Sequence, residues 1–350
     1  MQTFALQTKL CFGENALDAL SSLQAQRVLI VTDRFFAENG IAEQIGKRCG
    51  CEFRIFSEVQ PDPALTLIAQ GVQVMQDFSP DTLIALGGGS AIDCAKGMLS
   101  MSDKDACLIA VPTSSGTGSE VTSFAILSHD GVKHPLVNDA LRPRMAILDA
   151  SLLQKLPKSL IADAGMDVLA HCIEAVAAKN ASPFSEAFAV CAFRKALELL
   201  PKSYRGDSSV RETVHCAATM AGVAFDSAGL GACHALSHAI GGTFHLAHGR
   251  INGILLPHII TLNAPACTPS YNGLAGMCGL SGIAGLRLAI MRVRKQLELP
   301  ATLHEAGLER NAVLREAEAI SEAAVNDPCT LTNPRPVTKS DYLALLRSAL

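Results

Sequence analysis

The sequence has few charges and no cluster of basic residues. It contains 29 lysines and arginines against 33 aspartates and glutamates, for a net charge of −4, and charged residues make up only 18% of the chain. A chain without a basic tract is a poor partner for nucleic acid or for an anionic membrane. Apolar residues make up 49% of the sequence, which is enough for a substantial core and argues against a disordered chain.

Long apolar runs and an export signal are also missing. No run approaches the ~20 apolar residues that a membrane-spanning helix needs. Residues 1–9 lack the charged start and apolar core of a signal peptide, so we expect a cytoplasmic protein. The 12 cysteines are scattered and include no C-x-x-C pair. This pattern argues against a structural zinc knuckle and favours reduced, buried thiols.

What is present in the first half is an alternation of short apolar strands and amphipathic helices. We expect strands at residues 9–12, 27–33, 51–56, 82–86 and 108–111, and helices at 16–24, 36–49, 64–78 and 91–99. Nearly continuous apolar strands are typical of a parallel sheet that is covered on both faces. The pattern predicts a doubly wound, Rossmann-like α/β domain over residues 1–157. Beyond residue 149 only helical periodicity remains, which predicts an all-helical domain over residues 158–350.

Two glycine-rich loops follow neighbouring strands and are candidates for a nucleotide site. The first loop consists of Gly87, Gly88, Gly89 and Ser90. Its glycines let the backbone approach a ligand, and the start of the following helix favours a phosphate. It is neither G-x-G-x-x-G nor a P-loop, and such a turn often serves only chain reversal. Its place after a strand's carboxyl end favours the ligand site.

The second loop, residues 112–120, is rich in hydroxyl groups and glycine. It contains Thr113, Ser114 and Thr117, which offer hydrogen-bond donors to the same nucleotide. The alternative is a flexible surface loop. Asp33, at the end of the strand at 27–33, favours NAD over NADP, because a carboxylate accepts hydrogen bonds from a ribose and repels a 2′-phosphate. A helix N-cap explains Asp33 equally well.

The second half holds a candidate metal site. Four of the ten histidines lie within residues 234–248. His234 and His238 share a helix face, and we expect that helix to end before Gly241. Earlier in the chain, Asp167 and His171 lie four residues apart on a strongly apolar helix. A buried carboxylate is costly unless it is paired or bound to a metal, although a hydrogen bond within the helix is the alternative.

With His248, these residues make a site of one oxygen and three nitrogen ligands. The set Asp167, His171, His234 and His248 suits Fe²⁺, Zn²⁺ or another first-row divalent ion. An open coordination position would let such an ion act as a Lewis acid. No cysteine is placed to join the set, which argues against a closed structural zinc site.

These motifs resemble the iron-containing (group III) alcohol dehydrogenases nearly end to end. The shared motifs are the glycine loop 87–90 with Asp93 and Lys96, residues 112–122, Gly165-Met166-Asp167 to His171, residues 228–231 to His234, His248-Gly249, and Asn333-Pro334-Arg335. The chain most resembles the short propanol/ethanol dehydrogenases of the propanediol- and ethanolamine-utilisation type. One departure is Ala247, where the family usually has proline, so we expect a less rigid loop at 241–247.

The resemblance implies an NAD(H)-dependent enzyme of dehydroquinate synthase-like architecture. It would interconvert a short-chain primary alcohol and its aldehyde, reducing propanal or acetaldehyde and regenerating NAD⁺. Fe²⁺, or Zn²⁺ in its place, would be held by the four-residue set, and His238 would relay a proton. The residues implied around NAD are Asp33, Asp62, Gly87, Gly88, Gly89, Ser90, Thr113, Ser114, Thr117 and Lys133. The resemblance also implies a homodimer, with other microcompartment enzymes or shell proteins as further partners.

Three other functions fit parts of the sequence. A glycerol or polyol dehydrogenase of the same superfamily would use fewer histidine ligands. A metal-dependent lyase or hydrolase would need no nicotinamide. A scaffold component of a microcompartment would dock through the amphipathic end at residues 340–350, which is more often the last packed helix of a domain.

Overall fold

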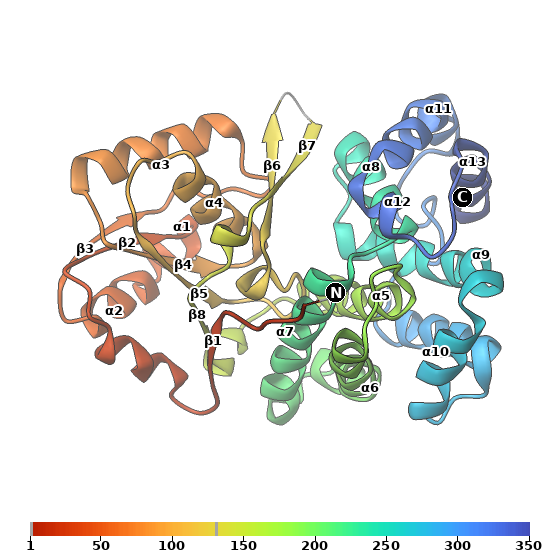
Figure 1. Cartoon of the computed structure of the whole chain (residues 1–350), viewed down its shortest axis with the longest axis horizontal. Coiled ribbons are helices and arrows are strands. Elements are labelled where there is room, and N and C mark those ends of the chain that lie inside the picture. Colours follow the sequence, from red (N-terminus) through yellow and green to blue (C-terminus); the bar gives the residue numbers. More distant parts are fainter. Residues whose placement is uncertain (1–2, 130–131) are drawn as a thin grey trace. The chain divides into compact units, whose positions relative to one another are not determined.

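The computed structural model describes residues 3–129 and 132–350, and it divides into two compact units, Met1–Lys155 and Leu156–Leu350. The first unit contains a six-stranded, all-parallel sheet (Figure 1). Its strands, in spatial order, are β1 (Lys9–Phe12), β8 (Met145–Leu148), β5 (Cys107–Pro112), β4 (Thr82–Gly87), β2 (Arg27–Val31) and β3 (Glu52–Phe56).

Both faces of this sheet are apolar and covered by helices. Leu29 and Leu83 pack in one core with α3 (Leu65–Phe78) and α4 (Gly89–Ser100). Their strand neighbours Ile30 and Ile84 point to the other side, because successive strand residues alternate between faces. There they pack with the 3-10 helix η1 (Ala16–Ser22), α1 (Arg34–Glu38) and α2 (Ile41–Arg48). The predicted doubly wound α/β fold is confirmed.

Some elements of the first unit differ from the sequence-based prediction. The helix expected at 36–49 is two helices, α1 and α2, because Gly40 adopts a left-handed φ of 74° between them. The antiparallel hairpin β6 (Phe124–His129) and β7 (Val132–Val137) was not predicted, and β6 contacts α4 (Figure 1). Three short 3-10 helices complete the unit: η2 (Ser119–Val121), η3 (Asp139–Leu141) and η4 (Ala150–Leu153).

The second unit is helical throughout. Its elements are α5 (Lys158–Ala177), α6 (Pro183–Tyr204), η5 (Ser208–Val210), α7 (Arg211–Ala228), α8 (Ala232–Phe244), α9 (His248–Met277), α10 (Gly282–Gln296), α11 (Arg310–Asn326), α12 (Pro328–Thr332) and α13 (Lys339–Ala349). Helix α5 is buried along most of its length and packs against α6, α7 and α9. A helix that is apolar on all sides is expected in such a central position.

The end of α8 differs from the prediction. The helix was expected to stop before Gly241, but it continues to Phe244 and ends at His245, whose φ of 55° is left-handed. Glycine inside a helix costs only about 1 kcal/mol, which packing of the helix can offset. The connection to α9 is therefore residues 245–247, shorter than the expected loop at 241–247. Ala247 is the N-cap of α9 and provides no side-chain cap.

Within the described ranges, no single helix is both long and apolar enough to cross a membrane, and only two sharply bent helix pairs meet that test on length and composition.

Candidate metal centre and nucleotide loops

Helix α5 presents three acidic or imidazole side chains on one face. Asp167, His171 and Glu174 are spaced four and three residues apart, which places them in line along a helix. All three are buried, with exposed fractions of 4%, 4% and 2%. Groups of this kind are rarely buried without a charged partner, a metal or several hydrogen bonds.

The close approach of α9 to α5 brings His248 to this face. A Cβ atom at Gly249 would lie 1.9 Å from the backbone oxygen of Asp163, so only glycine allows this packing. The next residue, Arg250, forms a two-pronged ion pair with the Asp163 carboxylate at 3.0 and 3.1 Å. Together these contacts hold the first turn of α9, which begins at His248, against α5.

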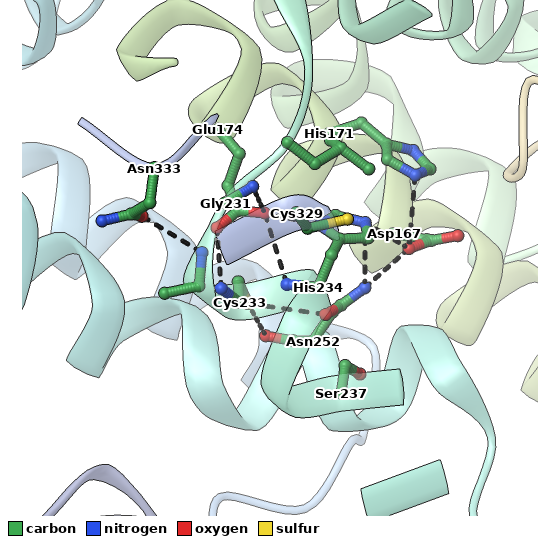
Figure 2. Close-up of polar contacts among 12 residues, drawn as sticks. Asp167, His171, Glu174, Gly231, Cys233, His234, Ser237, Asn252, Cys329 and Asn333 are labelled. Carbon is green, nitrogen blue, oxygen red and sulfur yellow. Dashed lines mark hydrogen bonds and ion pairs between the residues drawn. The ribbon is translucent and has the colours of Figure 1, made fainter. Parts of the chain in front are cut away.

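The three predicted imidazole ligands surround one oxygen of the Asp167 carboxylate. From the Asp167 Oδ1 atom, the Nε2 atoms of His234 and His248 lie 3.5 Å away and that of His171 lies 3.8 Å away. The rings of His171 and His234 stack with centroids 4.7 Å apart. Figure 2 shows Asp167, His171 and His234 directed toward one another.

These distances fit a divalent cation. Ligand bonds of about 2.1 Å in a tetrahedral site separate neighbouring ligand atoms by about 3.4 Å. The ligand atoms of Asp167, His234 and His248 all lie within 4.8 Å of one another, whereas His171 is outside this closest group and lies 3.8 Å from Asp167. One carboxylate and three imidazoles are also donors that suit Fe²⁺ or Zn²⁺. The site therefore fits the metal that the resemblance implies.

The buried amide of Asn252, one turn into α9, contacts the same atoms. Its Nδ2 atom lies 2.8 Å from Asp167 Oδ1, 3.0 Å from His248 Nε2 and 3.3 Å from His234 Nε2. An amide nitrogen has two N–H groups and cannot donate to three acceptors at once. When the Nε2 atoms of His234 and His248 are unprotonated, they and Asp167 Oδ1 present three acceptors to two N–H groups. A surplus of acceptors that face one another favours binding of a cation.

Glu174 holds His234 and the start of α8, a role that the sequence did not reveal. Its Oε2 atom lies 2.6 Å from His234 Nδ1 and accepts from the backbone N–H of Gly231, and its Oε1 atom accepts from that of Cys233 at 2.7 Å (Figure 2). Asn333 accepts from the N–H of Ala232. These side chains satisfy N–H groups that every helix start leaves unpaired. The seven-residue spacing from Asp167 to Glu174 was the available sequence signal.

Burial and neighbouring charges shift the protonation of the centre. Burial alone would raise the pKa of Asp167, but the imidazoles of His171, His248 and His234 hold it well below its usual range. Burial also opposes protonation of His234, yet hydrogen bonds to Asp167 and Glu174 raise the pKa of this imidazole to about 9. Burial lowers the pKa of His248 well below its usual value. A cation that binds His234 must therefore displace a proton.

His238 lies beside the four-residue set. Its ring stacks on that of His248, with centroids 5.1 Å apart and planes 15° from parallel. Its Nδ1 atom lies 2.8 Å from Asp327 Oδ2. His245, the fourth histidine of the run, is instead the exposed C-cap of α8.

In the first unit, the two glycine-rich loops lie side by side. Gly87 ends β4 and pairs with Pro112 of β5, and the N–H of Thr113 donates to the Gly87 oxygen at 2.9 Å. A Cβ at Gly88 would lie 3.4 Å from Ser114 Oγ, and one at Gly89 would lie 2.9 Å from Thr117 Cγ2. Gly88 is the N-cap of α4, with Gly89 and Ser90 in its first turn. The predicted residues of both loops thus lie together at the start of α4.

The remaining residues predicted around NAD are less closely gathered. Asp33 follows β2, the neighbour of β4, and is the N-cap of α1, where its Oδ1 accepts from the N–H of Phe36 at 3.2 Å. The helix N-cap expected for Asp33 is confirmed, and its carboxylate can accept further hydrogen bonds, such as those of a ribose. Asp62 lies in an exposed turn with a left-handed φ of 54°. The side chain of Lys133 lies outside the described part of the structure.

Lys96 of α4 fixes the end of the second loop and the residues that follow it. Its side chain is fully buried, and its Nζ atom contacts five oxygens of Ser119, Thr122 and Phe124 at 2.7–3.1 Å. Asp93, on the preceding turn of α4, accepts from the Ser119 hydroxyl at 2.6 Å. A buried ammonium surrounded by oxygens is satisfied, and it ties residues 119–124 to α4.

Comparison with known proteins gives consistent results along the chain. A family described as "Iron-containing alcohol dehydrogenase" matches residues 7–150, and "Fe-containing alcohol dehydrogenase family, C-terminal" matches residues 161–350. The chain is 38% identical to the 1-propanol dehydrogenase PduQ of Citrobacter freundii, covering 100% of both proteins. It is 35% identical to the NAD-dependent methanol dehydrogenase of Bacillus methanolicus, covering 95% of this chain and 94% of that protein. The solved structure of an iron-containing alcohol dehydrogenase from Thermococcus thioreducens matches with a TM-score of 0.93 and 31% identity over 99% of both chains.

Proposed function

Because this chain belongs to the iron-containing alcohol dehydrogenase family, we propose that it reduces short-chain aldehydes to primary alcohols with NADH. The observation that carries the metal part of this proposal is the placing of the His171, His234 and His248 imidazoles around the Asp167 carboxylate. The substrate class is supported by the full-length similarity to a 1-propanol dehydrogenase. Fe²⁺ is the proposed metal, with Zn²⁺ as a substitute that suits the same ligands.

The four proposed ligands would hold a cation that activates the substrate carbonyl. When bound, the cation supplies Lewis-acid polarisation of that carbonyl. Glu174 keeps His234 in the orientation that directs Nε2 toward Asp167. A carboxylate bound to the second nitrogen of a metal-ligating histidine is the common way to fix its ring and tautomer. Asn252 holds the Asp167 carboxylate through the 2.8 Å hydrogen bond to Oδ1.

The nucleotide is proposed to bind the first unit. Its pyrophosphate would lie at Gly87–Ser90, because the N–H groups at the start of α4 can donate to an anion. Thr113, Ser114 and Thr117 would donate to the rest of the cofactor from the adjoining loop. Asp33 would accept from the adenosine ribose and thereby favour NADH over NADPH. Roles for Asp62 and Lys133 around NAD stay predictions.

His238 is proposed to exchange the proton of the reaction. Reduction of an aldehyde consumes one hydride, supplied by NADH, and one proton, which must reach the carbonyl oxygen. His238 stacks on His248 and is partly exposed, so it lies between the candidate ligands and water. Imidazole is well suited to carry this proton near neutral pH.

The experiment is an NADH-oxidation assay on protein loaded anaerobically with Fe²⁺ or Zn²⁺. The panel contains ethanal, propanal and butanal, with dihydroxyacetone to represent a polyol dehydrogenase. We expect saturable NADH oxidation with the alkanals and formation of the matching alcohols. Activity only with dihydroxyacetone would refute the short-chain aldehyde as substrate and indicate a polyol dehydrogenase. The absence of NADH oxidation with every compound would overturn the whole proposal. A homodimer and a location in the cytoplasm within a microcompartment stay predictions, which light scattering and cell fractionation can test.

A further inference from the structure

Asp327 uses its two carboxylate oxygens for two different partners. It is the N-cap of α12, and its Oδ1 atom accepts from the backbone N–H of Cys329 at 2.8 Å. Its Oδ2 atom lies 2.8 Å from Nδ1 of His238, on α8. Both side chains are largely enclosed, with exposed fractions of 15% for Asp327 and 22% for His238. The pair is thus held by the fold and is not a loose surface contact.

The ring of His238 is constrained in two ways. Stacking on His248 limits the plane of the ring. The contact with Asp327 then limits which nitrogen faces which direction. An ionised carboxylate can only accept hydrogen bonds, so a nitrogen that faces it at 2.8 Å must carry hydrogen. The other nitrogen, Nε2, is left as the atom that gains or loses a proton.

We propose that Asp327 is a positioning residue that keeps the hydrogen of His238 on Nδ1 and reserves Nε2 for proton exchange. In aldehyde reduction, Nε2 first takes a proton from water, and the imidazolium gives that proton to the substrate oxygen as the hydride of NADH reaches the carbonyl carbon. The ring then returns to the Nδ1–H form. The Nδ1 hydrogen stays in its bond to Asp327 throughout. The kinetic part of this inference rests on the proposed function, whereas the tautomer of His238 does not.

Asp327→Asn is a sharp test because the N-cap selects the orientation of the new amide. The N–H of Cys329 needs an acceptor, so the amide oxygen stays at the Oδ1 position. The NH₂ group then takes the Oδ2 position and faces Nδ1 as a donor. Because this NH₂ group is a donor, Nδ1 of His238 must accept with its lone pair. The hydrogen of the neutral ring is then on Nε2. The substitution therefore inverts the tautomer while it preserves shape and cap.

Asp207→Asn is the matched control. Asp207 is the N-cap of η5 and likewise accepts from the N–H two residues later, that of Ser209, at 3.0 Å. It lies outside the candidate metal centre and the pair described here. The same change of acid to amide at the same kind of cap should leave His238 and turnover unaltered.

Two measurements on zinc-loaded protein test the proposal: the tautomer of His238 and the rate of aldehyde reduction. Nitrogen-15 NMR of labelled histidine distinguishes an N–H at Nδ1 from one at Nε2, with the His238 signals identified by their loss in His238→Gln. We expect Nδ1–H in the wild type and in Asp207→Asn, and Nε2–H in Asp327→Asn. We also expect kcat for aldehyde reduction to fall roughly 100-fold in Asp327→Asn, the lower end for lost acid–base catalysis, with KM for NADH and zinc content unchanged.

The outcomes separate this inference from the proposed function. An Nε2–H tautomer in the wild type, or a retained Nδ1–H in Asp327→Asn, would refute the role of Asp327. An inverted tautomer with unchanged kcat would refute its role in the reaction. If the wild type oxidises no NADH with any aldehyde, the proposed function fails, and the NMR result still decides the tautomer.

Discussion

Replacing Glu174 by glutamine should weaken metal binding and destabilise the second unit. The carboxylate accepts from His234 Nδ1 and Gly231 on Oε2 and from Cys233 on Oε1. Glutamine presents an NH₂ group at one of these positions. In either orientation a donor then faces a donor: the NH₂ group meets the N–H of Cys233, or it meets those of Gly231 and His234.

The expected magnitude follows from these contacts. A buried N–H that loses its acceptor costs about 1–3 kcal/mol. The lost negative charge at the start of α8 adds about 0.5–1 kcal/mol through the helix dipole. We therefore expect the free energy of unfolding of the metal-free protein to fall by about 1.5–4 kcal/mol. Loss of a carboxylate partner of a metal-ligating histidine typically weakens metal binding roughly 10–100-fold, or about 1.4–2.8 kcal/mol.

The two effects are measured separately. Urea unfolding of the metal-free protein reports the change in stability, and competition with a coloured chelator reports Zn²⁺ affinity. Glu212→Gln is the matched control, because Glu212 is exposed in the first turn of α7. A Glu174→Gln protein whose Zn²⁺ affinity equals that of Glu212→Gln would refute the assignment of Glu174 to the metal centre. A reduced affinity with unchanged stability would instead refute the hydrogen-bond reasoning.

Four further outcomes follow from the structure. Asp33→Gly should raise the ratio of kcat/KM for NADPH to that for NADH roughly tenfold, and an unchanged ratio would exclude Asp33 from cofactor choice. Lys96→Met removes a buried donor to five oxygens, so the free energy of unfolding by urea should fall by about 3 kcal/mol and KM for NADH should rise more than kcat falls. His234→Ala should lose both metal and turnover, while the exposed His304→Ala keeps both; an active, metal-free His234→Ala protein would contradict the ligand set. Burial raises the pKa of Cys94 from 9.0 to about 12, so its contribution to stability is complete below pH 9 and is lost as pH rises toward 12. Mass spectrometry should find Cys94 unlabelled by iodoacetamide at pH 8 in the folded protein.

Much of the fold could be predicted because its causes are local. The strands at 27–33 and 82–86 are short apolar runs that only a covered parallel sheet can bury, and they form β2 and β4. The hairpin of β6 and β7 escaped prediction, because its burial depends on contact with α4 and on the Lys96 network rather than on a clear alternation. The helix break expected at Gly241 failed for a related reason, since packing outweighed the low helix propensity of glycine.

The candidate site likewise contains residues that local spacing predicts and residues that it does not. The spacing of Asp167 and His171, followed later by His234 and His248, was enough to indicate metal-binding chemistry, as the two glycine loops were for a nucleotide. Asn252 and Asp327 carried no such signal. Asp327 lies 89 residues from the histidine it contacts, and an aspartate before Pro328 looks like an ordinary helix cap.

The amino-acid sequence by itself determined which side chains share a helix face and which loops follow strands, because periodicity and turn chemistry act over a few residues. It thereby specified the residue types of a metal centre and a nucleotide site. Only the tertiary structure decided which donors meet and which residues orient them. Helix α9 can approach α5 because residue 249 is glycine, and Glu174 reaches His234 from 60 residues away. Such contacts depend on how buried helices pack, a property of the whole core that no local pattern encodes.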